Sequence, residues 1–243
     1  MGKSPQDPKQ IFEEITFDYK GLYGEDLVSI LCYGSAARGE YRPGKSDINL
    51  MIVLSEKGIE DLDRSLKVVK KWRKSNVAVP LFVTRGYVRS SLDVFPIEYL
   101  DLQRYHTLVY GEDILQDLVL KPEFLRLQCE REIKGKLLLL REAFLNTDGK
   151  AKALHALISD SILSILAVFE ALLDLKGEAI PEKRRDLIQR TAETFDIDGP
   201  VFETLLAVKE DKVKMKDDEM RTLFKTYLSQ VRALSTLVDE FGG

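Results

Sequence analysis

The sequence is poor in the residues that build metal clusters and disulfide frameworks. Of its 243 residues, two are cysteines and two are histidines. Two cysteines do not form a disulfide framework, and two histidines exclude a histidine-rich metal cluster. The Gly-x-Ser-x-Gly pattern of a nucleophile elbow and the Cys-x-x-Cys pattern of a redox motif are also missing. Serine-hydrolase and thioredoxin-like chemistry are therefore not expected.

The sequence also lacks an excess of positive charge and a long hydrophobic run. Lys and Arg total 36 against 40 Asp and Glu, which gives a net charge of -4. Nucleic-acid-binding proteins usually present a basic face, so nucleic acid is not the expected partner. The first ten residues contain no apolar segment of the secretory kind. The most apolar stretch, residues 161–173, is interrupted by Glu170 and is too short to span a bilayer. We therefore expect a cytoplasmic protein with no membrane partner.

The hydrophobic pattern changes character near residue 120. Before this point, short apolar runs typical of strands alternate with helical segments, whereas beyond Pro122 the apolar residues recur at helical spacing. A chain of this length can bury two cores of modest size. The sequence therefore predicts an α+β fold, with a mixed-sheet N-terminal domain in residues 1–115 and an all-helical bundle in residues 120–243.

Several elements of the N-terminal domain can be placed from their patterns. Helices are expected in three segments, residues 7–24, 59–75 and 85–94. Apolar runs predict five strands, at residues 26–34, 47–54, 77–84, 97–103 and 106–115. Pro80 favours an edge position for the third strand or an early position within it, because proline cannot donate a hydrogen bond to a neighbouring strand.

The stretch YGSAARGEYRPGKSDINLMIVL, residues 33–54, carries the most informative pattern. Gly34 and Ser35 stand where a strand should end and a short helix begin, so backbone N–H groups there can approach a phosphate. Asp47 and Asn49 are two residues apart on the next strand, so their side chains share one face and can share a metal ion. The spacing predicts a site for a polyphosphate and its cation.

This pattern resembles the signature of the DNA polymerase β-type nucleotidyltransferase superfamily. The signature is Gly-Ser, a segment rich in Arg and Gly, Ser-Asp-x-Asp or Ser-Asp-x-Glu, and a hydrophobic strand, and the resemblance covers residues 25–110. The helical second half is similar in kind to the substrate-side domain of the aminoglycoside nucleotidyltransferases and to HEPN-type bundles. It lacks the Arg-x4–6-His motif of HEPN ribonucleases, so ribonuclease activity is not expected.

The resemblance implies roles for several residues in binding a nucleoside triphosphate. Gly34 and Ser35 would hold the β- and γ-phosphates, and Asp47 would ligate Mg²⁺. Arg38 can offer a phosphate a fork of donors. Lys45 lies in the following loop, where it can touch phosphate or face solvent.

Asn49 is the main departure from the family pattern. The family's second metal-binding carboxylate falls at this position, and an amide oxygen is neutral. Asn49 can fill a coordination position, but it supplies no charge to the cation and cannot bridge two metal ions as a carboxylate does. Losing one electrostatic stabiliser of the transition state raises the activation free energy by roughly 2–4 kcal/mol. The reaction then slows by roughly a hundredfold or more. We therefore expect weakly bound Mg²⁺ and impaired or absent catalysis.

A third catalytic carboxylate in this family usually comes from a later strand. Glu98 and Asp101 are the candidates, on the strand expected at residues 97–103. An odd separation directs two side chains to opposite faces of a regular strand, so only one of them should reach the site. The position in the pattern favours Glu98 slightly.

Each residue of the pattern also has a purely structural interpretation. Gly34 can end a strand, and Ser35 can cap a helix. Asp47 and Asn49 can begin a strand without holding a ligand, and Arg38 can face solvent.

Three hypotheses about function follow from the pattern. The first is transfer of a nucleoside monophosphate, from ATP or a similar triphosphate, to a hydroxyl group of a small molecule or macromolecule. The second is a non-catalytic nucleotide-binding or regulatory module that keeps the fold, and the third is an antitoxin-like interaction protein. Such a protein would use the bundle to hold a partner or a second copy of itself as a homodimer.

Overall fold

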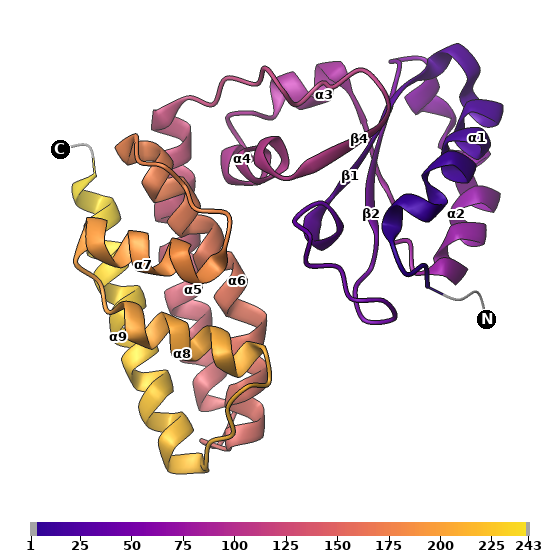
Figure 1. Ribbon diagram of the computed structural model, residues 1–243. Coiled ribbons are helices and arrows are strands. Elements are labelled where there is room, and N and C mark those ends of the chain that lie inside the picture. The colour runs from indigo at the N-terminus through magenta and orange to yellow at the C-terminus, as the bar shows by residue number, and fades with distance from the viewer. Residues whose placement is uncertain (1–3, 242–243) are drawn as a thin grey trace. The chain divides into compact units, whose positions relative to one another are not determined.

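The computed structural model describes residues 4–241, and the chain divides into two compact units between Leu120 and Lys121. Within the described residues, all strands belong to the first unit, and the second unit contains only helices (Figure 1). The prediction of an α+β fold with a mixed sheet and a helical C-terminal region is confirmed.

The N-terminal unit is built on a four-stranded mixed sheet with the order β3-β2-β1-β4. Strand β1 pairs antiparallel with both β2 and β4, whereas β2 pairs parallel with β3. The strands are β1 (Leu27–Tyr33), β2 (Asn49–Leu54), β3 (Leu81–Thr84) and β4 (His106–Gly111). Strand β3 lies at the edge, directly after Pro80, as the sequence predicts.

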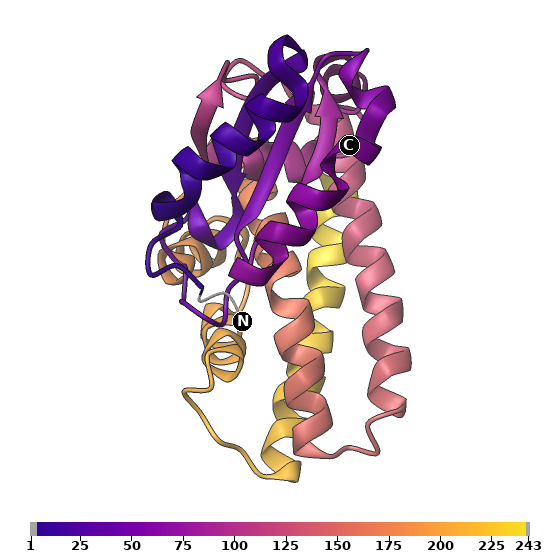
Figure 2. The same ribbon diagram turned by 90° about the vertical axis from the view of Figure 1, so that its right-hand side faces the viewer.

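One face of this sheet is covered by the two helices α1 and α2. Helix α1 (Phe12–Tyr23) and helix α2 (Leu66–Trp72) lie together on this face (Figure 2). Trp72 is buried and its Nε1 donates a hydrogen bond to Asp18 at 2.8 Å, which ties α2 to α1. Alternate residues of β1 and β2 complete this core, including Ile30, Cys32, Ile48, Leu50 and Ile52.

The opposite face of the sheet packs against helices α3 (Arg85–Ser90) and α4 (Pro96–Arg104). The Thr84 hydroxyl accepts a hydrogen bond from the N–H of Tyr87 at 3.0 Å, so the last residue of β3 also caps α3. The side chains of this second core come from β1, β2, β3, both helices and the loop after β4: Leu31, Met51, Val53, Val83, Val88, Tyr99, Leu102 and Leu115.

Short 3-10 helices complete the unit. They precede α1, flank α2 and follow β1, and their bounds are Pro8–Ile11, Gly24–Asp26, Gly34–Ala36, Gly58–Ser65 and Arg73–Ser75.

The prediction of a strand at residues 97–103 is wrong, because this segment forms helix α4. Pro96 occupies the first turn of the helix, where its missing N–H is no loss. The buried positions Ile97 and Tyr99 imitate the alternation of a strand, but the spacing from Tyr99 to Leu102 is helical. Short apolar segments often fit both the two-residue period of a strand and the 3.6-residue period of a helix.

The loop that follows β4 is held tightly against the unit. Gly111 has a φ of +81°, and a Cβ added there would lie 2.1 Å from the carbonyl oxygen of Val28, so only glycine fits. Nδ1 of His106 lies 2.8 Å from the carbonyl oxygen of Leu102, and Nε2 lies 3.0 Å from the Asp113 carboxylate. Both partners are acceptors, so both bonds form together only when the ring carries two protons.

Asp113 makes the stability of this unit dependent on pH. Partial burial raises its pKa, but the hydrogen bonds from His106 and from the N–H of Leu115 outweigh that effect and hold the pKa below its ordinary value. A lowered folded-state pKa adds stability above the unfolded value of about 3.9, and this stability is lost as the pH falls through the folded-state pKa.

We therefore expect Asp113→Asn to lower the free energy of unfolding near neutral pH and to have a shrinking effect as the pH is lowered. Urea unfolding between about pH 6 and pH 2 measures the difference between wild type and variant. Asp93→Asn, which changes an exposed carboxylate of the same unit, is the control. A difference that stays constant over this range would contradict the role of the Asp113 charge.

The C-terminal unit is a helical bundle centred on α6. In Figure 1, α5, α6 and α9 run side by side, while α7 and α8 lie across them. The helices are α5 (Pro122–Leu145), α6 (Ala151–Lys176), α7 (Arg184–Phe195), α8 (Gly199–Lys209) and α9 (Asp217–Glu240). Among the described residues, only α6 is long and apolar enough to cross a membrane, and 61% of its most apolar window is buried within the protein, as in the core helix of a bundle.

Candidate functional site

Three segments of the N-terminal unit meet where β1 ends. Tyr33, the last residue of β1, pairs with Asn49 at the start of β2 and with His106 at the start of β4. The chain then turns at Gly34, and the N–H of Arg38 donates to the Gly34 carbonyl at 3.0 Å. The regular helix expected after β1 is reduced to the 3-10 turn. This turn, the start of β2 and the end of α4 therefore lie together at one end of the strands, where β1 finishes and β2 and β4 begin.

Gly34 and Asn49 touch each other. Gly34 has a φ of +72°, and a Cβ added there would lie 3.0 Å from Nδ2 of Asn49. Both the positive φ and the close approach favour glycine at this position. The amide of Asn49 therefore lies directly beside the backbone of the Gly-Ser turn, where the resemblance to nucleotidyltransferases places phosphate groups.

Asp47 lies two residues before the first residue of β2. Ile48 is fully buried in the core under α1, so its neighbours Asp47 and Asn49 belong to the opposite face, on the side of α4. Asp47 is exposed and Asn49 is half-buried. The pKa of Tyr41, in the loop after the turn, is raised first by burial and second by the negative charge of Asp47. The Asp47 carboxylate therefore acts on this loop.

Arg38 is anchored to α4. Its guanidinium forms an ion pair with Asp101 and stacks on the ring of Tyr105, 3.6 Å from the centroid. Only 14% of the Arg38 side chain is exposed, compared with 31% of Asp101. Asp101 therefore compensates a half-buried cation and holds its guanidinium next to the turn.

Glu98 lies on the exposed surface of α4. Glu98 and Asp101 are three residues apart on this helix, so they share one side of it instead of facing opposite sides of a strand. The argument that strand geometry allows only one of them to reach the site is therefore wrong. Strands β3 and β4 contain no carboxylate in place of them.

Ser35 is half-buried in the turn, and its carbonyl accepts a hydrogen bond from the N–H of Glu40 at 2.9 Å. Lys45 is exposed in the loop before β2. Both side chains thus belong to the segments that frame the end of β1.

The oxygen donors at this end of the strands suit one magnesium ion better than two. Magnesium is usually held by one or two carboxylates together with the phosphates of its substrate. Asp47 supplies one carboxylate and Asn49 a neutral oxygen. Within residues 4–241, no three side chains of the His, Cys, Asp or Glu type converge as a metal site. The residues present therefore fit an ion that arrives with a triphosphate.

One pattern in this region escaped the sequence analysis. Residues 39–46, GEYRPGKS, match the spacing Gly-x4-Gly-Lys-Ser of a phosphate-binding P-loop. A true P-loop connects a strand to a helix, but this segment leads from the 3-10 turn into β2. Gly39 and Gly44 both have positive φ and serve as turns. The structural context therefore excludes a P-loop.

A cavity of the N-terminal unit lies apart from these residues. It measures about 160 Å³ and is formed by α3 and the loop after β4. None of the residues expected to bind nucleotide lines it. The candidate nucleotide site lies instead where β1 ends and β2 begins.

Comparison with known proteins agrees with this geometry. Residues 9–105 match the model of a family described as nucleotidyltransferase domain. This range contains the turn, the start of β2 and α4. No curated protein sequence matches the chain.

A solved structure also shares the fold. It is that of the spectinomycin adenyltransferase of Enterococcus faecialis with ATP and spectinomycin, and it matches 90% of this chain and 99% of its own with a TM-score of 0.51. Only 12% of the aligned residues are identical, so the likeness concerns the fold.

Proposed function

We propose that the protein transfers a nucleoside monophosphate from a triphosphate to a hydroxyl acceptor, and that Asn49 slows this reaction. The proposal is supported by the match of residues 9–105 to a family model described as nucleotidyltransferase domain. The observation that carries the proposal is the meeting of the Gly34 turn with the start of β2. The Gly34 backbone lies against the Asn49 amide, and Asp47 extends from the same strand.

The reaction requires an in-line displacement at the α-phosphorus. The acceptor oxygen forms a new bond to phosphorus, the bond to the β-phosphate oxygen breaks, and pyrophosphate leaves. The hydroxyl proton passes to a base, which is solvent or a carboxylate. A magnesium ion bound with the triphosphate would neutralise phosphate charge and orient the leaving group.

The residues of this chain divide these tasks between them. The Gly34–Ser35 turn offers N–H and hydroxyl donors to the phosphates, and Arg38 adds a charged fork that α4 holds in place. Asp47 would hold the ion that accompanies the triphosphate. Asn49 would offer that ion a neutral oxygen without adding charge, so less charge would be available to stabilise the transition state.

A second candidate function is nucleotide binding without transfer. It is favoured by the ion pair between Asp101 and Arg38, because a carboxylate that compensates an arginine is a poor base. In this case the Gly34 turn and Asp47 would still hold a nucleotide, and the protein would act as a sensor or as an interaction protein controlled by it.

Isothermal titration with ATP, with and without Mg²⁺, together with a pyrophosphate assay, tests the proposal. Spectinomycin is the first acceptor to try, because the similar structure contains it. We expect magnesium-dependent binding of ATP and slow release of pyrophosphate. Asp47→Asn should abolish the magnesium dependence, whereas the matched change Asp93→Asn should not.

The other outcomes are equally informative. Binding of ATP without release of pyrophosphate to any hydroxyl acceptor would favour the non-catalytic module. Absence of ATP binding would contradict both proposals and would favour an interaction protein of the antitoxin kind.

A further inference from the structure

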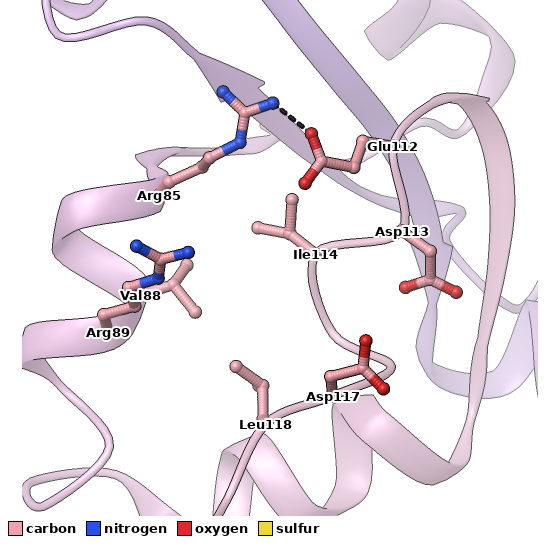
Figure 3. Close-up of a pocket in the computed structure, with 8 residues that line it drawn as sticks. All are labelled: Arg85, Val88, Arg89, Glu112, Asp113, Ile114, Asp117 and Leu118. Atoms are coloured by element: carbon pink, nitrogen blue, oxygen red, sulfur yellow. Dashed lines mark hydrogen bonds and ion pairs between the residues drawn. The ribbon is translucent and has the colours of Figure 1, made fainter.

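The 160 Å³ cavity of the N-terminal unit has walls of opposite charge. Helix α3 contributes Arg85 and Arg89, which are four residues apart and therefore lie on one side of it. The loop after β4 contributes Glu112, Asp113 and Asp117 from across the cavity (Figure 3). Three apolar side chains lie between the charges, and they are Val88, Ile114 and Leu118.

The charged groups of this cavity are not equally available. Arg85 forms an ion pair with Glu112, drawn as a dashed line in Figure 3. Asp113 is engaged by His106 and by the N–H of Leu115. Within residues 4–241, neither the side chain of Arg89 nor that of Asp117 forms a hydrogen bond or an ion pair. One cation and one anion are thus left on opposite walls.

The loop wall is held by contacts within the N-terminal unit. Leu115 is fully buried in the core, and the Gln103 side chain donates hydrogen bonds to the carbonyls of Gln116 at 2.9 Å and Leu118 at 3.1 Å. Gly111 sets the direction in which the chain leaves β4. A wall held by these contacts loses little entropy when a ligand binds, which is the advantage of a preformed site.

We propose that this cavity binds a small zwitterion, of the class of α-amino acids with a short apolar side chain. The ligand carboxylate meets Arg89, its ammonium group meets Asp117, and its side chain covers Val88, Ile114 and Leu118. The volume is close to that of an engineered cavity of about 150 Å³ that holds benzene, so a ligand of about six to eight non-hydrogen atoms fits.

Other classes of ligand agree less well with these walls. Glu112, Asp113 and Asp117 do not converge as a metal site within the described residues. A phosphate or another simple anion would meet three carboxylates as well as the arginines. A neutral apolar molecule would contact Val88, Ile114 and Leu118 but would gain nothing from the charges of Arg89 and Asp117.

Methyl NMR of the full chain tests this proposal, because Val88, Ile114 and Leu118 all carry methyl groups that can be labelled. We expect alanine and valine to shift these three methyl signals saturably, while the methyl signals of Leu138 in the helical unit stay unchanged. N-acetylvaline lacks the positive charge and valinamide lacks the negative charge, so each should bind at least about tenfold more weakly than valine.

Two variants test the assignment of the charges. Arg89→Gln and Asp117→Asn should each weaken valine binding about tenfold or more, and both residues are exposed, so the fold should be unaffected. The matched changes Arg73→Gln and Asp93→Asn alter exposed charges of the same unit outside the cavity and should leave binding unchanged. No saturable shift, equal binding of the blocked analogues, or binding that survives both cavity variants would overturn the proposal.

Discussion

Asn49→Asp is expected to raise the activity or the magnesium affinity of the protein by roughly a hundredfold. The added carboxylate supplies the charge that the amide lacks, and one electrostatic stabiliser in an active site is worth roughly 2–4 kcal/mol. The two side chains have the same shape, so the contact with Gly34 remains sterically possible. The rate of pyrophosphate release measures the gain. Where turnover is too slow to follow, the magnesium dependence of ATP binding measures it.

A control separates the site from a general effect of charge. Asn76→Asp adds the same charge to the same unit, in the turn that follows α2, and should change neither quantity. The gain from Asn49→Asp should disappear when Asp47→Asn is combined with it, because the new carboxylate needs its neighbour to hold the ion. If Asn49→Asp leaves both the rate and the magnesium dependence unchanged, Asn49 is not a weakened metal ligand.

The sequence predicted which strand ends form the candidate site, because the pattern that marks them is local in the sequence. Gly34, Asp47 and Asn49 stand at the ends of two apolar runs that are strong enough to be identified as strands. An antiparallel pairing of consecutive strands then brings the end of the first to the start of the second. The apolar pattern therefore determined both the fold class and the meeting of these residues.

The role of Asp101 could not be predicted in the same way. Its ion pair joins residues 63 positions apart, and it exists because the segment from Pro96 to Arg104 is a helix that brings Asp101 back to the turn after β1. Read as a strand, the segment gave the wrong relation between Asp101 and Glu98. Side-chain contacts between distant elements depend on packing that no local pattern contains.

The cavity beside α3 was hidden for a related reason. Arg85 and Arg89 are ordinary charges on a short helix, and the carboxylates of the loop after β4 are ordinary loop residues. Only the fixation of that loop by Gly111, His106 and Gln103 sets the two groups opposite each other.

Gly111→Ala is expected to destabilise the N-terminal unit by about 3 kcal/mol or more, combining overpacking with strain at a positive φ. The new Cβ would lie 2.1 Å from the carbonyl oxygen of Val28, which is backbone of β1 and cannot move without disturbing the centre of the sheet. Urea unfolding followed by circular dichroism measures the loss in free energy.

Gly21→Ala is the matched control, because Gly21 lies inside α1 with nothing within 4 Å of an added Cβ. Alanine in a helix interior is favoured over glycine by about 1 kcal/mol, so this variant should be more stable than the wild type. The same substitution should therefore act in opposite directions at two positions of one unit.

Because Gly111 also directs the loop that forms the cavity wall, Gly111→Ala should weaken valine binding even under conditions where the unit stays folded. If Gly111→Ala is as stable as the wild type, the close approach of β4 to β1 at this position is not present in solution, and the fixed wall of the cavity loses its main support.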